Sequence, residues 1–297
     1  MLNSAIDNQS CNFAEWGVDM RWLVGLLMLG VCSAASAQDA DEAALLAAVN
    51  SYRSEPRLCA QQVFEALPPL FAEQRLRLGL QPAGDLQAEV AAKGYPMASV
   101  QAISLSGPRD VQGAMQALRD SFCSLLLSPE FVDFALSREG REWRIVLARP
   151  LLASRLDAPR AEGEALLVLL NSARSQARQC GGQAFAAAPA LRWSAVLAGV
   201  AEGHSRAMAN RNFFAHRGED GSIPGDRVEL AGYSASLVGE NLAAALDSPQ
   251  RVLQAWLDSP AHCANLMNAR FREAGIAYAV DPKSAVGIYW TALFAAP

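Results

Sequence analysis

Apolar residues recur at helical spacing in two stretches of the second half of the chain. The first stretch covers residues 162–179, and its recurring apolar residues are Leu166, Leu169 and Leu170. The second begins at Ser194 and is predicted to end near Asn210. The residues on its apolar face are Leu197, Val200, Ala201, His204 and Met208. Both stretches are therefore predicted to be amphipathic helices.

The pattern changes towards the C-terminus. Residues 275–280 and 286–294 are apolar in alternation or continuously, and a turn at Asp281-Pro282 separates them, which predicts a β-hairpin. Residues 221–239 are rich in glycine, proline and serine and are predicted to form a loop. Because the helices precede a late hairpin, the pattern indicates an α+β fold with helices layered on a sheet.

Two serine–proline pairs predict further helix starts. In Ser248-Pro249 and in Ser259-Pro260 the serine hydroxyl can accept a hydrogen bond from the first turn. The proline that follows suits the first helical position because its missing N–H is not needed there. We therefore expect a helix to begin at each pair.

The first half of the chain repeats the second. Residues 45–70 align with residues 166–191 without a gap. The matched pairs are Asn50 with Asn171, Arg53 with Arg174, Arg57 with Arg178, Cys59 with Cys180, Phe64 with Phe185, and Pro68 with Pro189. Further on, Cys123 matches Cys263, Phe131 matches Phe271, and Trp143 matches Trp290. This repetition predicts two tandem copies of one domain.

The copies differ in their candidate chemistry. Residues 1–203 contain no histidine and no Gly-Glu-Asn motif, so the first copy is predicted to be degenerate. The expected boundaries are a degenerate repeat over 38–152, a linker over 153–161 with a break at Pro159, and a complete domain over 162–297.

The N-terminus has the pattern of an export signal. Met20-Arg21 precedes an apolar run, and Ala35-Ser36-Ala37 matches a signal-peptidase site, so a signal peptide over 20–37 is predicted. Residues 1–19 are interpreted as a start-site extension. An uncleaved anchor and a lipoprotein attached at Cys32 are the alternatives. The run is short for a membrane span, so we expect a secreted or periplasmic protein without a transmembrane helix.

Cleavage would leave Cys59, Cys123, Cys180 and Cys263, which allow three disulfide pairings. The repeat favours one equivalent bond in each copy, Cys59–Cys123 and Cys180–Cys263. Each bond would connect the first helix of its copy to a later helix and stabilise the fold by about 4 kcal/mol. Free buried thiols are the alternative, although an oxidising compartment disfavours them.

Composition and charge exclude one class of partner. The chain is 52% hydrophobic and 19% charged, as expected for a protein with a sizeable core. The net charge is −5 and no cluster of basic residues stands out, so we expect no binding to nucleic acid.

The 3 histidines, His204, His216 and His262, all lie in the second half. Histidine is the side chain best suited to metal binding and proton transfer near neutral pH. His204 falls on the apolar helix face and is predicted to be a packed core residue, as are Trp256 and Trp290. His216 and His262 are therefore the candidate site residues.

An ordered series of short motifs covers residues 163–297. Its members are Asn171, Arg174, Trp193, His204, Phe213–His216, Arg227, Gly232-Tyr233, Gly239–Asn241, Trp256, Ser259–His262, Gly275 and Tyr289-Trp290. In this order they resemble the CAP superfamily (SCP/PR-1-like, with cysteine-rich secretory proteins, antigen 5 and pathogenesis-related 1) in its bacterial secreted branch. The resemblance implies an α-β-α sandwich.

The resemblance also implies a cleft lined by two histidines and two glutamates, which holds zinc or another divalent metal in several members. By motif, His216 and His262 are the cleft histidines and possible metal ligands, and Glu240 is one cleft glutamate. Ser259 occupies the position of the other glutamate. A metal-free, hydrogen-bonded cleft and a loop-holding role for Glu240 stay open. Arg227 is expected to hold the neighbouring loop by hydrogen bonds.

Three functions are compatible with these residues. The first is a non-catalytic exported module that binds a lipid, glycan, peptide or protein of the cell envelope or the exterior. The second is a metal-assisted hydrolase acting on peptide or envelope substrates, with Glu240 as the general base. The third is a structural protein with a vestigial cleft. The incomplete set of glutamates and the absence of a Gly-x-Ser-x-Gly motif favour the first.

Overall fold

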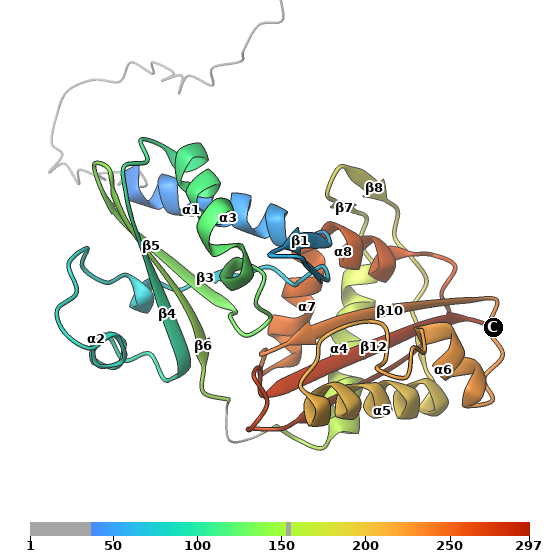
Figure 1. Ribbon diagram of the computed structural model, residues 1–297. Helices are drawn as coiled ribbons and strands as arrows, with labels where there is room; N and C mark the ends of the chain where they lie inside the picture. Colours follow the sequence, from blue (N-terminus) through green and yellow to red (C-terminus); the bar gives the residue numbers. More distant parts are fainter. Residues whose placement is uncertain (1–36, 153–155) are drawn as a thin grey trace, which may run out of the picture. The chain divides into compact units, whose positions relative to one another are not determined.

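The computed structural model describes residues 37–152 and 156–297, here called the first and second halves (Figure 1). The predicted start-site extension and the apolar run of the signal peptide lie outside the described residues. Within these two ranges, no helix combines the length and the apolar character needed to cross a membrane.

The second half is an α+β unit. Its elements are α4 (Pro159–Arg174), β7 (Arg178–Cys180), β8 (Gln183–Phe185), β9 (Arg192–Trp193), α5 (Ala195–Arg211), α6 (Pro224–Leu230), β10 (Leu237–Ala244), α7 (Pro249–Asp258), α8 (Pro260–Met267), β11 (Glu273–Val280) and β12 (Ile288–Ala296). The main sheet has the order β10-β12-β11-β9, with only the β9–β11 pair parallel. Helices α5 and α6 lie on one side of it and α7 and α8 on the other (Figure 1).

The central strand β12 is buried along its whole length. A strand covered on both faces needs apolar residues on both, which explains the continuous apolar run in its sequence. Trp256 and Trp290 are fully buried, as predicted, and each indole N–H donates to a carbonyl oxygen, of Leu242 at 2.9 Å and of Leu246 at 2.8 Å. Trp193, which packs against the same core, differs because its buried indole N–H has no hydrogen-bond partner.

Some boundaries differ from the sequence prediction. Helix α4 begins at Pro159, inside the predicted linker, and ends at Arg174 because a short β-hairpin follows. Helix α6 lies within the predicted loop 221–239. It starts with Pro224, and Asp226 accepts from the backbone N–H of Ile223 at 3.0 Å. A helix this short shows too few turns for its apolar spacing to be recognised.

The first half has its own sheet. Its elements are α1 (Ala37–Arg53), β1 (Arg57–Cys59), β2 (Gln62–Phe64), β3 (Phe71–Ala72), the 3-10 helix η1 (Gln74–Leu76), α2 (Leu86–Ala92), β4 (Met97–Ser106), α3 (Val111–Leu126), β5 (Asp133–Glu139) and β6 (Glu142–Pro150). The sheet order is β3-β5-β6-β4, and only the β3–β5 pair is parallel. The sheet of the second half, taken in the order β9-β11-β12-β10, has the same arrangement of parallel and antiparallel pairs. Helix α3 is kinked at Phe122, whereas the second half has two separate helices, α7 and α8.

Two buried arginines make the same hydrogen bonds in the two halves. Arg53 donates to the carbonyl oxygens of Pro68, Leu126, Ser128 and Phe131. Arg174 donates to those of Pro189, Leu266, Asn268 and Phe271. Each guanidinium thus connects the first helix of its half to the segments that precede the sheet strands. Buried donors of this kind require such partners, because an unsatisfied one is costly.

Both disulfides join the cysteines that the repeat pairs. Cys59 in β1 is bonded to Cys123 in α3, and Cys180 in β7 is bonded to Cys263 in α8. The bonds therefore hold the small hairpin that follows the first helix of each half, rather than the helix itself as the sequence had indicated.

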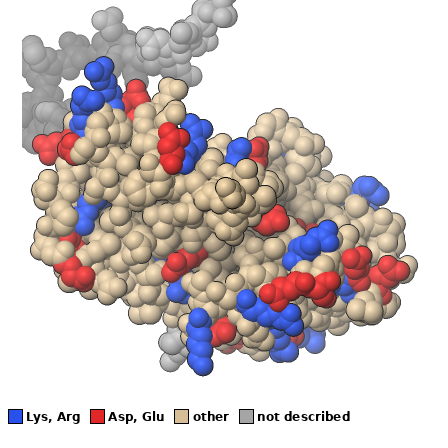
Figure 2. Space-filling view, viewed as in Figure 1, with Lys and Arg blue, Asp and Glu red and all other residues tan. Residues whose placement is uncertain are grey.

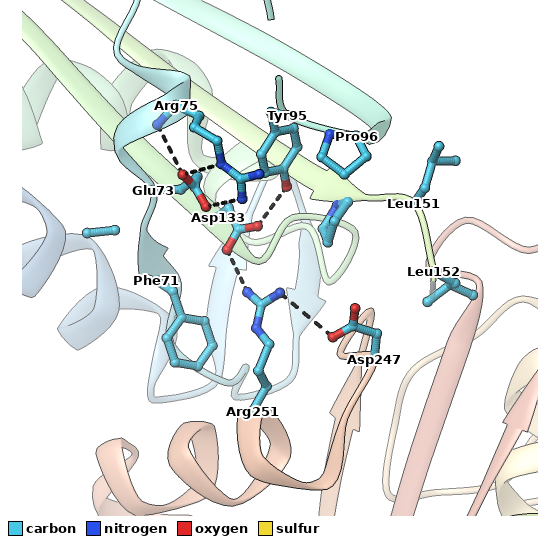
Figure 3. A pocket seen from close by; sticks show the side chains of 12 residues that line it. Phe71, Glu73, Arg75, Tyr95, Pro96, Asp133, Leu151, Leu152, Asp247 and Arg251 are labelled. Carbon is cyan, nitrogen blue, oxygen red and sulfur yellow. Dashed lines mark hydrogen bonds and ion pairs between the residues drawn. The ribbon is translucent and has the colours of Figure 1, made fainter. Parts of the chain in front are cut away.

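A pocket of about 620 Å³ lies where the two halves meet (Figure 3). Arg251 of α7 reaches into it and donates to Asp133 of β5, with 2.6 Å between Nη2 and Oδ1. Tyr95 donates to the other oxygen of Asp133, also at 2.6 Å. The guanidinium of Arg251 also lies over the ring of Phe71, 5.1 Å from its centroid. Charged and aromatic side chains from both halves therefore form one bonded cluster.

Candidate functional site

The candidate site is a cleft of about 750 Å³ formed by α8, β10 and the loop that follows α5. Its polar lining residues are His216, Glu240, Asn241, His262, Asn265 and Asn268. Its apolar walls include Met267, Phe185 and several alanines, and Ala66 of the first half also lines it. The cleft thus brings together His216, Glu240 and His262, which are far apart in the sequence.

Local structure explains how these residues reach the cleft. Helix α5 ends at Asn212, which has the left-handed conformation (φ 54°) and turns the chain into the loop that contains His216. Gly239 precedes Glu240 on β10, and a Cβ atom there would lie 2.6 Å from both Asn265 Oδ1 and Phe271 Cζ. Only glycine therefore lets β10 approach α8 this closely.

Glu240 is held on both carboxylate oxygens. Its Oε1 lies 2.8 Å from Nδ1 of His216, and its Oε2 accepts from Nη2 of Arg227 at 2.7 Å. The Glu240 side chain is only 1% exposed, whereas that of His216 is 40% exposed. The carboxylate is therefore a buried anchor, and the imidazole of His216 is the group that faces solvent.

Arg227 holds the loop around the site, as predicted. Its Nη1 donates to the carbonyl oxygens of His216 at 3.0 Å and Ser222 at 3.1 Å. Together with its ion pair to Glu240, these bonds fix the backbone on both sides of the loop. The planar guanidinium suits this role because it offers several donors in a rigid arrangement.

His262 is buried at the start of α8. Its Nδ1 lies 2.9 Å from Oγ of Ser259. Burial, together with the nearby His216, lowers the pKa of His262 to about 4, so its imidazole is neutral at pH 7. The Ser259 side chain bonds this ring and makes no capping bond to α8, and it is buried and does not line the cleft, where the sequence had placed it. Its hydroxyl therefore orients the imidazole and leaves Nε2 as the ring nitrogen for a ligand in the cleft.

Two asparagines complete the polar side of the cleft. Asn241 donates to the carbonyl oxygen of His262 at 3.1 Å. Asn265 donates to Oδ1 of Asn241 at 2.9 Å and to the carbonyl oxygen of Glu240 at 3.2 Å. The sequence analysis missed Asn265. Its position three residues after His262, on the same face of a helix, was the available signal.

His204 lies apart from the cleft histidines. It is 3% exposed on the inner face of α5, which confirms its predicted core position. Its Nε2 lies 2.9 Å from the carbonyl oxygen of Ala215, next to His216 in the chain. Burial lowers the pKa of His204. This histidine therefore bonds the backbone of the loop that carries His216 and does not line the cleft.

The donor set does not fit a zinc site with three protein ligands. The carboxylate of Glu240 is shared by His216 and the cation of Arg227, and Ser259 stands where a second glutamate would be. Within residues 37–152 and 156–297, no three His, Cys, Asp or Glu side chains are grouped so as to hold a metal ion. Catalytic zinc sites use three such ligands. The arrangement fits a hydrogen-bonded cleft better.

The charged surface is mixed. On the face shown in Figure 2, acidic and basic side chains lie interspersed, without a broad area of one sign.

A model of the cysteine-rich secretory protein family (CAP) matches residues 167–294. Among curated proteins, YkwD of Bacillus subtilis is 30% identical over 104 residues, which are 35% of this chain and 38% of YkwD. The membrane protein YlbC of the same organism is 30% identical over 86 residues, which are 29% of this chain and 25% of YlbC. The chain thus spans well under half the length of these relatives.

Solved structures give weaker matches. An extracellular protein of Bacillus anthracis that contains an SCP domain is 24% identical with a TM-score of 0.40, and the match covers 54% of this chain and 53% of that one. An outer surface protein of Borrelia burgdorferi is 20% identical with a TM-score of 0.39, over 48% and 98% of the two chains. The family model spans residues 167–294, and with them His216, Glu240 and His262, so this segment of the chain carries a CAP domain.

Proposed function

We propose that this protein is an exported, non-catalytic binding module whose cleft holds a small ligand. The observation that carries the proposal is the state of Glu240, whose two carboxylate oxygens are both engaged and whose side chain is only 1% exposed. A general base must reach the proton that it removes. Glu240 instead bonds His216 and orients its imidazole. The cleft therefore offers a ligand hydrogen-bonding groups that are held in fixed positions.

The lining of the cleft supports a small organic ligand. Its volume of about 750 Å³ is in the range of ligand pockets. Neutral His262 and the asparagines at its base can donate to and accept from a ligand, and the alanines, Met267 and Phe185 supply apolar walls. This combination suits a ligand with both polar groups and apolar surface, such as a peptide, a glycan or a lipid of the cell envelope.

Export is the second part of the proposal. The signal-like segment over 20–37 supports it, as do the two disulfides, which persist in oxidising compartments. A secreted or periplasmic location follows from these features.

We also propose that the first half is a degenerate copy of the CAP domain that lost its own site. The shared strand order and the matched bonds of Arg53 and Arg174 support a common origin. When Trp143 and Trp290 are matched, the strand registers align Glu240 with Ala102 and Asn241 with Ile103. Matching Cys123 with Cys263 aligns His262 with Phe122. This half also contributes Ala66 to the wall of the cleft in the second half.

The proposal is tested by titrating the disulfide-bonded protein with defined probes and following the histidine and asparagine side-chain NMR signals. The probes are diacetylchitobiose, trialanine and decanoate. We expect at least one to saturate and to lose about tenfold or more in affinity in Asn265→Ala. Arg270→Ala, an exposed position near the cleft, is the matched control.

The same samples test the alternative, a metal-assisted hydrolase. Elemental analysis and a zinc titration, each compared with His216→Ala/His262→Ala, measure whether the two imidazoles bind metal. Turnover of a peptide or envelope substrate that disappears in His216→Ala would overturn the non-catalytic assignment. Cleft signals that no probe moves would contradict the binding role.

A further inference from the structure

A second pocket, here called the Arg149 pocket, has a volume of about 630 Å³. It lies between the ends of β4 and β6 in the first half and the turn between β11 and β12 in the second. Its walls are mainly apolar and include Met97, Leu151, Leu152, Tyr278 and Val280. Leu151 is 57% exposed and Val280 is 43% exposed, so both offer apolar surface that a ligand could cover.

Arg149 supplies the charge in this pocket. Its Nε is buried and has no hydrogen-bond partner, and no carboxylate among the described residues forms an ion pair with its guanidinium. Asp281, in the nearby turn, accepts from the backbone N–H of Lys283 at 2.9 Å. Because this guanidinium has no anionic partner among the described residues, its outer N–H groups can pair with an acceptor that comes from outside the chain.

The fold does not require an arginine at this position. When the terminal strands of the two sheets are matched through Trp143 and Trp290, Arg149 corresponds to Ala296. The guanidinium also reaches the turn of the other half, since a Cβ atom at Gly287 would lie 2.7 Å from its Nη1. Gly287 has φ +77° and leaves the space that the arginine occupies. The cation is thus accommodated by residues of both halves.

We propose that the Arg149 pocket binds a carboxylic acid with an apolar body. The carboxylate would accept two N–H bonds from the guanidinium, which is the geometry that arginine offers best. The apolar body would cover Leu151 and Val280 and fill the volume between the halves. This site is separate from the His–Glu cleft, and its occupancy does not depend on what the cleft binds.

The test is a calorimetric titration of the disulfide-bonded protein with decanoate, and with decanamide as its neutral counterpart. We expect decanoate to bind in the Arg149 pocket and decanamide to bind there at least roughly tenfold more weakly. Arg149→Gln should reduce decanoate affinity by a similar factor. Arg119→Gln removes an exposed arginine with no ion pair among the described residues, and should leave the affinity unchanged.

A second variant covers the case in which Arg149→Gln does not fold. Met97→Trp would fill the pocket without touching the charge and should also prevent decanoate binding. Three results would overturn the proposal. They are equal binding of decanoate and decanamide, unchanged decanoate affinity in both variants, and decanoate affinity that falls in His262→Gln but not in Arg149→Gln. The last result would place the acid in the His–Glu cleft.

Discussion

Arg251 and Asp133 form an ion pair across the two halves, with 2.6 Å between Nη2 of the arginine and Oδ1 of the aspartate (Figure 3). The Asp133 side chain is 5% exposed and that of Arg251 is 28% exposed. Burial raises the pKa of Asp133, and Arg251 opposes this shift. Burial therefore disfavours the ionised carboxylate, and the arginine reduces this cost.

Removing the arginine should destabilise the contact between the halves. In Arg251→Ala the buried carboxylate loses its cationic partner, so we expect the free energy of unfolding to fall by about 1–3 kcal/mol at pH 7. Urea denaturation measures this change, with Arg270→Ala as the exposed control. A double-mutant cycle with Asp133→Asn isolates the pair. An additive cycle would show that the pair does not couple the halves.

The destabilisation caused by Arg251→Ala should change with pH in a defined direction. The raised pKa of Asp133 means that its contribution to stability is present below the unfolded pKa and is lost as pH rises through the folded pKa. Loss of Arg251 removes an effect that lowers this pKa, so the destabilisation should be larger at pH 7 than at pH 4. Unfolding free energies of Arg251→Ala and the wild type at both pH values provide the comparison.

His262 should make the protein sensitive to mild acid. Its pKa falls from 6.5 to about 4 on folding, so its stabilising contribution is present above pH 6.5 and is lost as pH falls towards 4. The loss over this range is up to about 3 kcal/mol. Urea unfolding at pH 7 and pH 4.5 should show a smaller difference for His262→Gln than for the wild type. The same difference in both proteins would assign the acid sensitivity to other groups.

Gly239 should be intolerant of a side chain. A Cβ atom there would meet Asn265 and Phe271 at 2.6 Å, and the ring of Phe271 is in the core. Gly239→Ala should therefore destabilise the protein by about 1–3 kcal/mol through overpacking. Gly203→Ala is the matched control, because a Cβ atom on that helical glycine meets no atom within 4 Å. Thermal unfolding measures both variants. Similar melting temperatures would show that β10 can move away from α8.

Much of the fold could be predicted because its signals are local. Ser248 caps α7 with its side chain, as the serine–proline pair predicted, and Ser194 caps α5. The apolar runs predicted β11 and β12 because both faces of the sheet are covered. Helix α6 was missed, since it is short and lies in a segment rich in glycine and proline.

The two halves share one further kind of hydrogen bond, from a tyrosine to an acidic residue at the start of a sheet strand. Tyr95 donates to Asp133 at 2.6 Å, and Tyr233 donates to Glu273 at 2.7 Å, and each tyrosine follows a glycine with positive φ. One acidic residue is an aspartate and the other a glutamate, and the spacing between motifs differs in the two halves. A comparison of residue identities alone therefore did not match these tyrosines and acidic residues.

The candidate site was only partly accessible from sequence. The motifs identified His216, Glu240 and His262, whereas the partners of these side chains depend on three-dimensional contacts. Nothing in the spacing indicated that Ser259 would bond the ring of His262 or that Asn265 would reach Asn241. The Asn265–Asn241 bond joins two different elements, whereas the Ser259–His262 bond lies within the first turn of α8, and in both cases side-chain direction decides whether the bond forms.

Arg227 should control the order of the loop that carries His216. Its guanidinium donates to His216, Ser222 and Glu240, so Arg227→Gln should raise amide hydrogen exchange in residues 212–223. Loss of these charge-assisted bonds should lower the free energy of local opening by about 1.5–3 kcal/mol. Arg217→Gln removes an exposed arginine of the same loop that donates to the carbonyl oxygen of Gly221, and should change exchange much less. Equal effects of the two variants would show that Glu240 and His216 hold the loop without Arg227, and that the arginine serves mainly to balance the buried carboxylate.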